Sequence, residues 1–491
     1  MPSLMLESAS ARKELGSFYT PKHVAQSLVK WAVRSPDDSL LDPSCGDGRF
    51  LQEHKRATGV DCDVAAVAAV ARHVRHATVI GADFFEWAAL TPLRFDCAAG
   101  NPPFIRYQRF AGTTRSAALE LCSRLGVKFS SLTSSWAPFV AVAASLLKPG
   151  GRMAFVVPAE IGHSPYAIPL VEYLLKRFAD VRVIAVRDKV FPDLSEDVWF
   201  VYADGYGGHT DRISFTRWDS FQITSTPPVC DLNISRKDWE RSNKRLRPFV
   251  LPRPVLAAYL KWAECPDVVR FGEAAKVGIG YVTGDNDFFH LRPSQARALG
   301  IPDDYLVASV RRASYLPDDD VTISTVAKWL REDQPVLLLR LLPSGKILDS
   351  IEAYLNTKDG RRARATYKCR NRSPWYTVPD VRVPDGFLAY MSGGAPKLVA
   401  NSAGCVCTNS IHAVRVKHGY AMNELKRRWA HPLVNLSCEL EGHPLGGGML
   451  KLEPTEAARV ILPSAGLRLS RSEKAAVEEG VLRLRRWRHY A

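Results

Sequence analysis

Short apolar runs and amphipathic stretches alternate along the chain between residues 17 and 203. The runs are typical of buried strands and the stretches of helices. A first helix is expected around Val24–Ala32, with Thr20 at its cap and Pro21 in its first turn. Further helices are expected at about Val64–Val74, Trp136–Leu147 and Ile168–Phe178. The expected strands are Ser39–Asp42, Gly59–Asp61, Thr78–Gly81, Phe95–Ala99, Arg152–Val157, Val181–Val186 and Val198–Ala203.

This alternation predicts a Rossmann-like, doubly wound α/β domain over residues 14–225, with a mostly parallel sheet and a hairpin at its edge. The Pro-rich residues 226–228 and the basic tract Arg241–Arg247 are typical of a linker. From Pro248 onward the pattern is mixed, so residues 248–491 are expected to form an α+β domain. Its expected elements are the strands Phe387–Met391 and Val406–Val416 and the helices Val255–Ala263 and Ala421–Ala430.

Composition narrows the class of protein. Of 491 residues, 46% are hydrophobic and 24% charged, which is typical of globular chains. No apolar stretch is long enough to span a membrane and the first 16 residues make a poor signal peptide, so a cytoplasmic protein is expected. The ten cysteines are scattered without a C-x-x-C pair, so reduced thiols and no metal are expected.

The positive charge is concentrated in the second half. The chain carries a net charge of +15, of which +13 lies in residues 221–491. Such a basic half predicts a polyanion partner. One cluster contains Arg361, Arg362, Arg364, Arg370 and Arg372, with Lys368 and the aromatic Tyr367, Trp375 and Tyr376 beside it. Residues 483–488 form a second, arginine-rich run. Either cluster can contact phosphates, or simply form a solvated helix face.

Acidic residues end three successive strands. The turn Asp42–Phe50 contains glycines, which allow close backbone approach to a ligand, but it lacks the G-x-G-x-x-G pattern. Asp61 can accept hydrogen bonds from both hydroxyls of a ribose. Asp83 can accept from an adenine amino group and Phe84 can cover the ring, although Asp83 can equally cap a helix. Together these strand ends predict a site for S-adenosylmethionine.

The segment Asn101-Pro102-Pro103-Phe104 follows the fourth expected strand. The prolines fix the backbone, so the Pro102 carbonyl and the Asn101 side-chain oxygen can form neighbouring acceptors. Such a pair can take both hydrogens of an exocyclic amino group and direct its lone pair at an electrophile, while Phe104 stacks on the ring that bears the amine. Because a sulfonium methyl group is already activated, positioning does most of the work.

The chain at this point resembles the gamma-class DNA adenine-N6 methyltransferases of the TaqI type. The matching segments are Gly16–Pro21, Asp42–Gly48, Gly59–Asp61, Ala82–Phe85, Asn101–Phe104 and Val190–Pro192. Looser matches in the second half are Val282–Asn286, Pro374–Tyr376 and Thr408–His412, which resemble the family's target-recognition domain. The resemblance implies methyl transfer from S-adenosylmethionine to an adenine that has been flipped out of duplex DNA.

The resemblance also implies a role for each matching residue. Thr20 and Pro21 would contact the methionine end of the cofactor, and Asp42, Cys45 and Gly46 would line the cofactor turn. Asp61 would hold the ribose, and Asp83 with Phe84 the cofactor's adenine. Asn101 would stand beside the cofactor and, with Pro102 and Phe104, would grip the target base. Phe191 would pack on the other face of that base, although a core phenylalanine is an equal interpretation.

Alternatives stay open at this stage. The same catalytic segment suits cytosine-N4, RNA or glutamine methylation, although the glutamine enzymes lack a long basic extension. A non-catalytic specificity subunit with a relict cofactor site is a third interpretation. No nuclease motif is evident, so a modification enzyme is expected. Whether its partner is a restriction endonuclease, a larger defence complex or nothing stays open.

Overall fold

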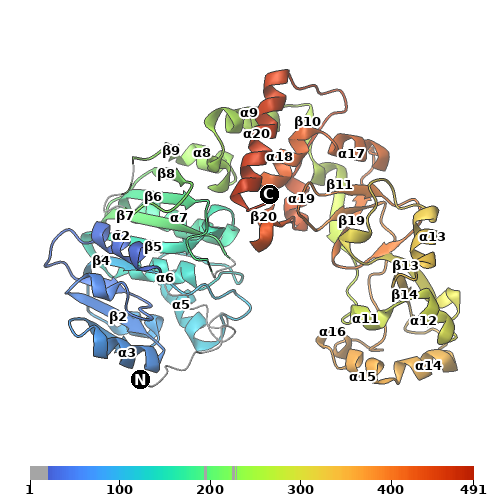
Figure 1. The fold of residues 1–491 in the computed structure, drawn as a ribbon, viewed down its shortest axis with the longest axis horizontal. Coiled ribbons are helices and arrows are strands. Elements are labelled where there is room, and N and C mark those ends of the chain that lie inside the picture. Colours follow the sequence, from blue (N-terminus) through green and yellow to red (C-terminus); the bar gives the residue numbers. More distant parts are fainter. Residues whose placement is uncertain (1–19, 193–195, 224–226, 228, 491) are drawn as a thin grey trace. The chain divides into compact units, whose positions relative to one another are not determined.

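The computed structural model describes residues 20–192, 196–223, 227 and 229–490. The chain divides into two compact units, Met1–Val250 and Leu251–Ala491 (Figure 1), and each is described by itself. The part of the matching segment Gly16–Pro21 that precedes Thr20 lies outside the described residues.

The first unit is built on one nine-stranded sheet in the order β3-β2-β1-β4-β5-β7-β6-β8-β9. The first five neighbours, β3 to β5, run parallel, whereas β7 is antiparallel to both β5 and β6. Its strands are β1 (Leu40–Asp42), β2 (Ala57–Asp61), β3 (Thr78–Gly81), β4 (Phe95–Gly100), β5 (Leu147–Pro158), β6 (Phe178–Val186), β7 (Val198–Tyr206), β8 (Arg212–Trp218) and β9 (Leu232–Ser235). The Rossmann-like, doubly wound domain is therefore confirmed.

Helices bury the apolar strand residues on both faces of this sheet. Helix α2 and helix α3 share a core cluster with inward residues of β1, β4, β5 and β7. Helices α4, α5, α6 and α7 pack in sequence on one another over the other face (Figure 1). The helices are α2 (Lys22–Ala32), α3 (Val64–His73), α4 (Phe84–Leu90), α5 (Gly112–Arg124), α6 (Trp136–Ser145), α7 (Ile168–Arg177) and α8 (Arg236–Arg241).

Three local expectations about the first unit are wrong. Helix α2 begins at Lys22 with Pro21 at its cap, one residue later than expected. The β6–β7 hairpin is not at the sheet edge, because β8 and β9 continue the sheet beyond β6. The tract Arg241–Arg247 is not a solvated linker, since Arg245 and Arg247 are only 6% and 5% exposed. In the last case tertiary burial overrides a local composition signal.

The second unit mixes short strands with short helices, as expected for an α+β unit. Its sheets have the orders β10-β22, β11-β19-β15-β17, β12-β14-β13-β18 and β16-β21-β20. The predicted strand 406–416 is divided, because β18 pairs with β13 whereas β19 lies between β11 and β15.

These sheets and helices enclose three buried clusters. The strands are β10 (Val268–Arg270), β11 (Ala275–Ile279), β12 (His290–Leu291), β13 (Leu306–Val310), β14 (Leu337–Leu339), β15 (Gly386–Ala389), β16 (Met391–Ser392), β17 (Leu398–Ala400), β18 (Val406–Cys407), β19 (Ile411–Val416), β20 (His443–Pro444), β21 (Leu450–Lys451) and β22 (Ile461–Pro463). The helices are α9 (Arg253–Ala263), α10 (Phe271–Ala274), α11 (Asn286–Phe289), α12 (Pro293–Ala298), α13 (Ile323–Arg331), α14 (Asp349–Leu355), α15 (Lys358–Arg364), α16 (Tyr367–Arg370), α17 (Met422–Trp429), α18 (Pro432–Glu441), α19 (Pro454–Arg459) and α20 (Arg471–Trp487).

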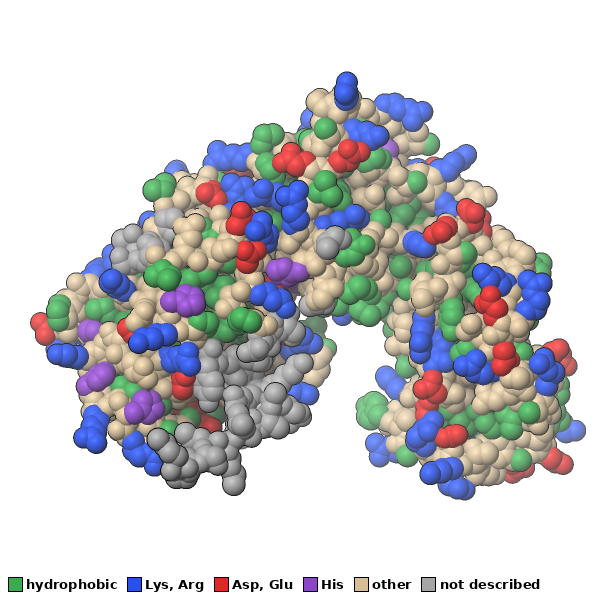
Figure 2. All heavy atoms as spheres, viewed as in Figure 1, with side chains coloured by type: hydrophobic (Ala, Val, Ile, Leu, Met, Phe, Trp, Pro, Cys, Tyr) green, Lys and Arg blue, Asp and Glu red, His purple; other side chains and the backbone are tan. Residues whose placement is uncertain are grey.

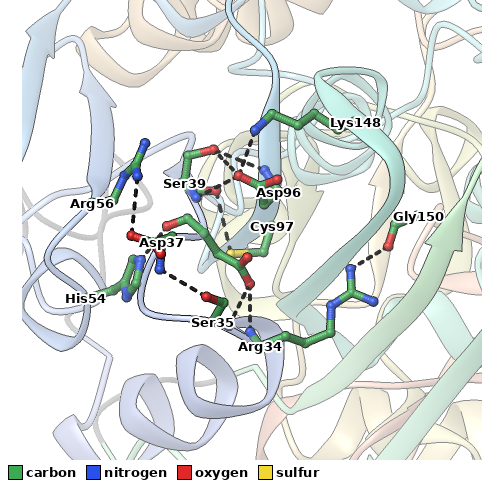
Figure 3. A network of polar contacts seen from close by, with 11 residues as sticks. Arg34, Ser35, Asp37, Ser39, His54, Arg56, Asp96, Cys97, Lys148 and Gly150 are labelled. Carbon is green, nitrogen blue, oxygen red and sulfur yellow. Dashed lines mark hydrogen bonds and ion pairs between the residues drawn. The ribbon is translucent and has the colours of Figure 1, made fainter.

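A polar network ties together the amino ends of β1 and β4 (Figure 3). One carboxylate oxygen of Asp96 accepts hydrogen bonds from the Ser39 amide at 2.9 Å and hydroxyl at 2.7 Å, and from Lys148 at 2.7 Å. Partial burial raises the pKa of Asp96, but the bonds from Lys148 and Ser39 lower it further, to about 2. The network lies at the strand ends opposite to those that carry the predicted site, so its role is structural.

This network predicts a pH-dependent contribution to stability. The folded-state pKa of Asp96 lies below its ordinary value of 3.8, so the stabilisation is complete above about pH 4 and is lost as the pH falls toward 2. We expect Asp96→Asn to lower the free energy of unfolding at pH 6 by more than at pH 3, as measured by urea denaturation. Asp37→Asn is the control, since its pair with Arg56 spans 3.7 Å and its side chain is 90% exposed. An equal loss at both pH values would contradict the assignment.

Candidate functional site

The turn after β1 is shaped by two glycines in the left-handed backbone region. Gly46 has a φ of +47° and Gly48 a φ of +78°. A Cβ atom at Gly48 would lie 2.7 Å from Cγ1 of Val70 on α3, so the turn packs tightly on that helix. The Cys45 amide donates to the Val60 carbonyl of β2 at 3.0 Å. The turn is thereby fixed at the carboxyl edge of the sheet, where doubly wound folds bind their ligands.

Asp61 at the end of β2 holds this turn from the neighbouring strand. Its Oδ2 accepts the Gly46 amide at 2.8 Å, and its Oδ1 accepts the Asp63 amide at 3.0 Å. A carboxylate oxygen has two lone pairs, so each oxygen keeps one acceptor position. Asp61 can therefore position the turn and still bind a pair of hydroxyls.

Asp83 at the end of β3 has the structural role that the sequence left open. Its Oδ1 caps α4 by accepting the Phe85 amide at 2.9 Å and the Glu86 amide at 3.2 Å. Its Oδ2 accepts the Thr114 hydroxyl of α5 at 2.8 Å, so an adenine amino group would share this oxygen. The adjacent Phe84 is buried and stacks on Phe139 with ring centroids 5.2 Å apart.

These strand ends surround a cavity of about 380 Å³. A cavity of this size is within the range of small-ligand sites. Seven of the sequence-predicted residues line it: Thr20, Cys45, Gly46, Asp61, Asp83, Phe84 and Asn101. Pro21, Asp42, Pro102, Phe104 and Phe191 are not among its lining residues. The cavity therefore brings six of the cofactor candidates together with Asn101, but not Pro21 or Asp42.

Asp42 lies beneath the turn and is fully buried. Its Oδ1 accepts the Ser44 amide at 3.2 Å, whereas no donor among the described residues reaches its Oδ2. Burial raises the pKa of Asp42 well above its ordinary value, against the lowering effect of the Ser44 bond; Asp61 and Asp47 raise it further. An orphaned buried carboxylate oxygen needs a donor or a proton, so this position favours a ligand with hydroxyl or ammonium groups.

The Asn-Pro-Pro-Phe segment presents one backbone acceptor without a partner. The Asn101 carbonyl accepts the Ser44 hydroxyl at 3.3 Å, and the Pro103 carbonyl accepts the Ser135 hydroxyl. Pro102 is a buried residue, and its carbonyl, which lies between the other two in sequence, accepts no hydrogen bond from the described residues. The acceptor that the sequence argument selected is thus not used by the described residues.

Ser135 fixes this segment from the start of α6 and was not found from the sequence. It is fully buried, its hydroxyl accepts the Ile105 amide at 3.0 Å, and its own amide donates to the Ile105 carbonyl at 3.0 Å. Arg109, Thr114 and Phe139 also line the cavity without having been predicted. The Asn-Pro-Pro-Phe motif shows that a rigid segment is present, but nothing in its spacing indicates what holds it.

The two aromatic residues expected around a target base share one core cluster. Phe191 is only 6% exposed, and the partly buried Phe104 packs against the same cluster. Next to them, Arg106 and Glu196 form an ion pair at 2.7 Å between the two segments that carry these rings. The interpretation of Phe191 as a core residue is thus correct for its packing, and a stacking role requires a base to enter beside it.

The predicted basic clusters of the second unit differ in exposure. Arg361, Arg364 and Arg370 are exposed, whereas Arg362 forms ion pairs with Asp359 at 2.8 Å and Asp285 at 3.3 Å. Arg372 donates to the backbone carbonyls of Val282 and Thr283, and burial lowers its pKa. In the terminal run, Arg485 and Arg488 pair with the buried Glu439, at 3.1 Å and 2.7 Å. Much of the second run is therefore structural.

The looser motifs of the second half converge around Tyr281. Its hydroxyl bonds to His290 at 2.7 Å and to Ser309 at 2.5 Å, and its backbone bridges to Thr408. Trp375 packs against Phe288 with ring centroids 5.9 Å apart. Within the described residues, no group of three His, Cys, Asp or Glu side chains could hold a metal ion. No helix there is long and apolar enough to cross a membrane.

The fold and the cavity define a Rossmann-like methyltransferase, and comparison with known proteins identifies its family. The type II methyltransferase M.Eco57I C-terminal domain model matches residues 243–488. The Eco57I restriction-modification methylase model matches residues 67–191, and the N-6 DNA methylase model matches residues 4–62. The chain belongs to this family of type II methyltransferases, and it is a DNA methyltransferase of the N6-adenine type.

Individual relatives extend this match over nearly the whole chain. Type II methyltransferase M.AccI of Acinetobacter calcoaceticus is 21% identical over 94% of this chain and 87% of its own length. Type II methyltransferase M.XamI of Xanthomonas campestris pv. amaranthicola is 23% identical over 91% and 85%. Among solved structures, the type IIL restriction-modification enzyme MmeI in complex with DNA aligns with a TM-score of 0.52 at 13% identity, covering 96% of this chain and 72% of that one. This last likeness supports the fold alone.

Proposed function

We propose that the protein transfers a methyl group from S-adenosylmethionine to the N6 amino group of an adenine flipped out of duplex DNA, with the gamma-class, TaqI-type site described above. The observation that carries this proposal is the unpartnered Pro102 carbonyl between two occupied carbonyls, next to the cavity-lining Asn101. Together the two oxygens would accept both hydrogens of the amino group and direct its lone pair toward the cavity. Phe104 would cover one face of the base and Phe191 the other.

The cavity suits the donor through its own polar groups. Asp61 keeps an acceptor position on each oxygen for the ribose hydroxyls, and Phe84 supplies an aromatic wall for the adenine. Thr20, Cys45 and Gly46 line the part of the cavity proposed for the amino-acid end, whereas Pro21 and the buried Asp42 adjoin lining residues without lining the cavity themselves. Bound there, S-adenosylmethionine would supply a methyl group on sulfonium, and no metal is needed.

The second unit supplies the DNA contacts in this proposal. Arg361, Arg364 and Arg370 present exposed guanidinium groups that suit phosphates. Contacts to the duplex offset the cost of unstacking one base. We further propose that the enzyme protects its site in a restriction-modification or phage-defence system, with a separate endonuclease or defence complex as partner.

The test is methyl transfer in vitro. The purified full-length protein would be incubated with tritium-labelled S-adenosylmethionine and unmethylated duplex DNA, and the product would be hydrolysed and its nucleosides separated. Label in N6-methyladenine is the expected result. Label in N4-methylcytosine, or DNA binding with no transfer, would overturn the proposal. Sequencing of the modified positions would then give the recognition site.

Ser135 gives a prediction on the positioning of the catalytic segment. Ser135→Ala removes the hydroxyl that joins the Pro103 carbonyl to the Ile105 amide, so the Pro102 carbonyl should lose its fixed direction. We expect kcat to fall roughly 10- to 100-fold, the scale of a small misplacement, with unchanged affinity for S-adenosylmethionine. Ser135→Thr keeps the hydroxyl and should restore part of kcat. Equal kcat for Ser135→Ala and the parent would show that the segment is rigid without this bond.

A further inference from the structure

The second unit contains a hollow of about 660 Å³ beside the end of β11, α16 and β19. Four cationic side chains line it, those of Lys368, Arg372, Arg382 and Arg415, against the single acid Asp380. On the face of this unit that Figure 2 draws, Lys and Arg are interleaved with Asp and Glu. The hollow is thus a local concentration of positive charge on a surface of mixed charge.

One of the four cations forms the fixed part of the hollow. The Arg372 guanidinium donates to the Thr283 carbonyl at 2.6 Å and to the Val282 carbonyl. These bonds attach the segment after α16 to the segment after β11. Arg372 was expected to bind DNA directly. Because its guanidinium already donates to these two backbone carbonyls, we infer that it holds the two segments that line the hollow together.

The other three cations are available to a ligand. Lys368 lies 5.9 Å from the ring centroid of the exposed Tyr367, and Arg415 projects from β19. Neither forms an ion pair with any residue that the structure describes. Arg382 reaches Asp380 at 3.8 Å, and the two side chains are 70% and 80% exposed. So exposed and so long an ion pair contributes little, and one phosphate of a polyanion can replace the carboxylate.

We propose that this hollow is a second DNA contact site of the second unit, distinct from the exposed arginines of α15. Lys368 and Arg415 bind phosphates of the duplex, and Arg382 exchanges Asp380 for a phosphate when DNA binds. The inference rests on the proposed function for its ligand. Two exposed cations, Lys368 and Arg382, with the half-buried Arg415 beside them in an open hollow, suit a polyanion rather than a single small anion, which needs buried, convergent donors.

The exchange predicts opposite effects from the two members of the Arg382–Asp380 pair. Arg382→Gln should weaken binding to a duplex and lower the slope of log affinity against log salt by about 0.9, the value for one phosphate contact. Lys368→Gln and Arg415→Gln should each do the same. Asp380→Asn should instead tighten binding, because it removes the competing carboxylate. Asp380 has a φ of +57°, a conformation that Asn adopts readily, so this variant should fold.

Fluorescence anisotropy with a labelled duplex, at salt concentrations from 50 to 300 mM, would measure these slopes on the full-length protein. Arg471→Gln at the start of α20 is the matched control for loss of one exposed charge. A double variant with Arg361→Gln and Arg364→Gln measures the contribution of α15 to DNA binding separately. A parental slope in the Lys368, Arg382, Arg415 triple variant, or no gain from Asp380→Asn, would overturn the hollow as a DNA site. Absence of DNA methylation by the parent would instead refute the proposed function.

Discussion

Asn101→Ala should remove most methyl transfer while leaving S-adenosylmethionine and DNA bound. The substitution removes one of the two acceptors proposed to hold the amino group, and the Pro102 carbonyl alone cannot orient its lone pair. Loss of one preorganised group that acts on the reacting atoms costs roughly 100- to 1000-fold in kcat. Single-turnover transfer of tritium to a duplex would measure this loss, and equilibrium dialysis would measure donor binding.

Asn101→Asp is the matched variant for this test. It keeps a side-chain oxygen of nearly the same position and should therefore retain more transfer than Asn101→Ala. If Asn101→Ala turned over at the parental rate, the paired-acceptor arrangement would be wrong, whatever the remaining residues do. If donor binding fell as much as kcat, Asn101 would be a cofactor residue rather than a residue that holds the base.

Asp61→Ala should weaken donor binding by roughly 100-fold or more. A hydrogen bond to a charged group contributes about 1.5–3 kcal/mol, and the two oxygens of Asp61 are proposed to hold two ribose hydroxyls. Titration calorimetry with S-adenosylmethionine would measure the change. Because Asp61 also accepts the Gly46 amide, part of the loss could come from displacement of the turn.

A donor analogue separates these two causes. The parent should bind a 2′-deoxyribose analogue of S-adenosylmethionine more weakly than the natural donor, and Asp61→Ala should bind both alike, as expected for a coupled pair of changes. If the variant still discriminated between the two donors, another residue would hold the ribose, and Asp61 would act only through the turn.

The first unit could be predicted closely because its chemistry follows its secondary structure. The strands β1, β2 and β4 are short, largely buried apolar runs and β3 is a short apolar run at the sheet edge, so the positions of Asp42, Asp61 and Asp83 at or just after strand ends follow from the pattern. The contacts between elements could not be predicted in this way. Ser135 and Thr114 reach the site through packing of α6 and α5, and neither has a local sequence signal.

The second unit could be predicted much less closely than the first. Its strands are two to six residues long and pair across large sequence separations, so the local pattern places few of them. The positive charge of the sequence also overstated the basic surface of this unit, because the guanidinium groups of Arg372 and Arg488 donate hydrogen bonds to partners inside it. A run of arginines predicts a basic surface only when buried acids and carbonyls do not take up its donors, and the sequence does not show whether they do.

The pairing of Arg488 with Glu439 has a practical consequence. Arg488 lies one residue beyond α20, is 1% exposed, and donates to Glu439 and to the carbonyls of Gly393 and Gly448. A fusion partner or affinity tag added behind it must leave this arginine in place, and a deletion that seems to remove only a charged tail would strip the counter-ion from an acid in the protein interior.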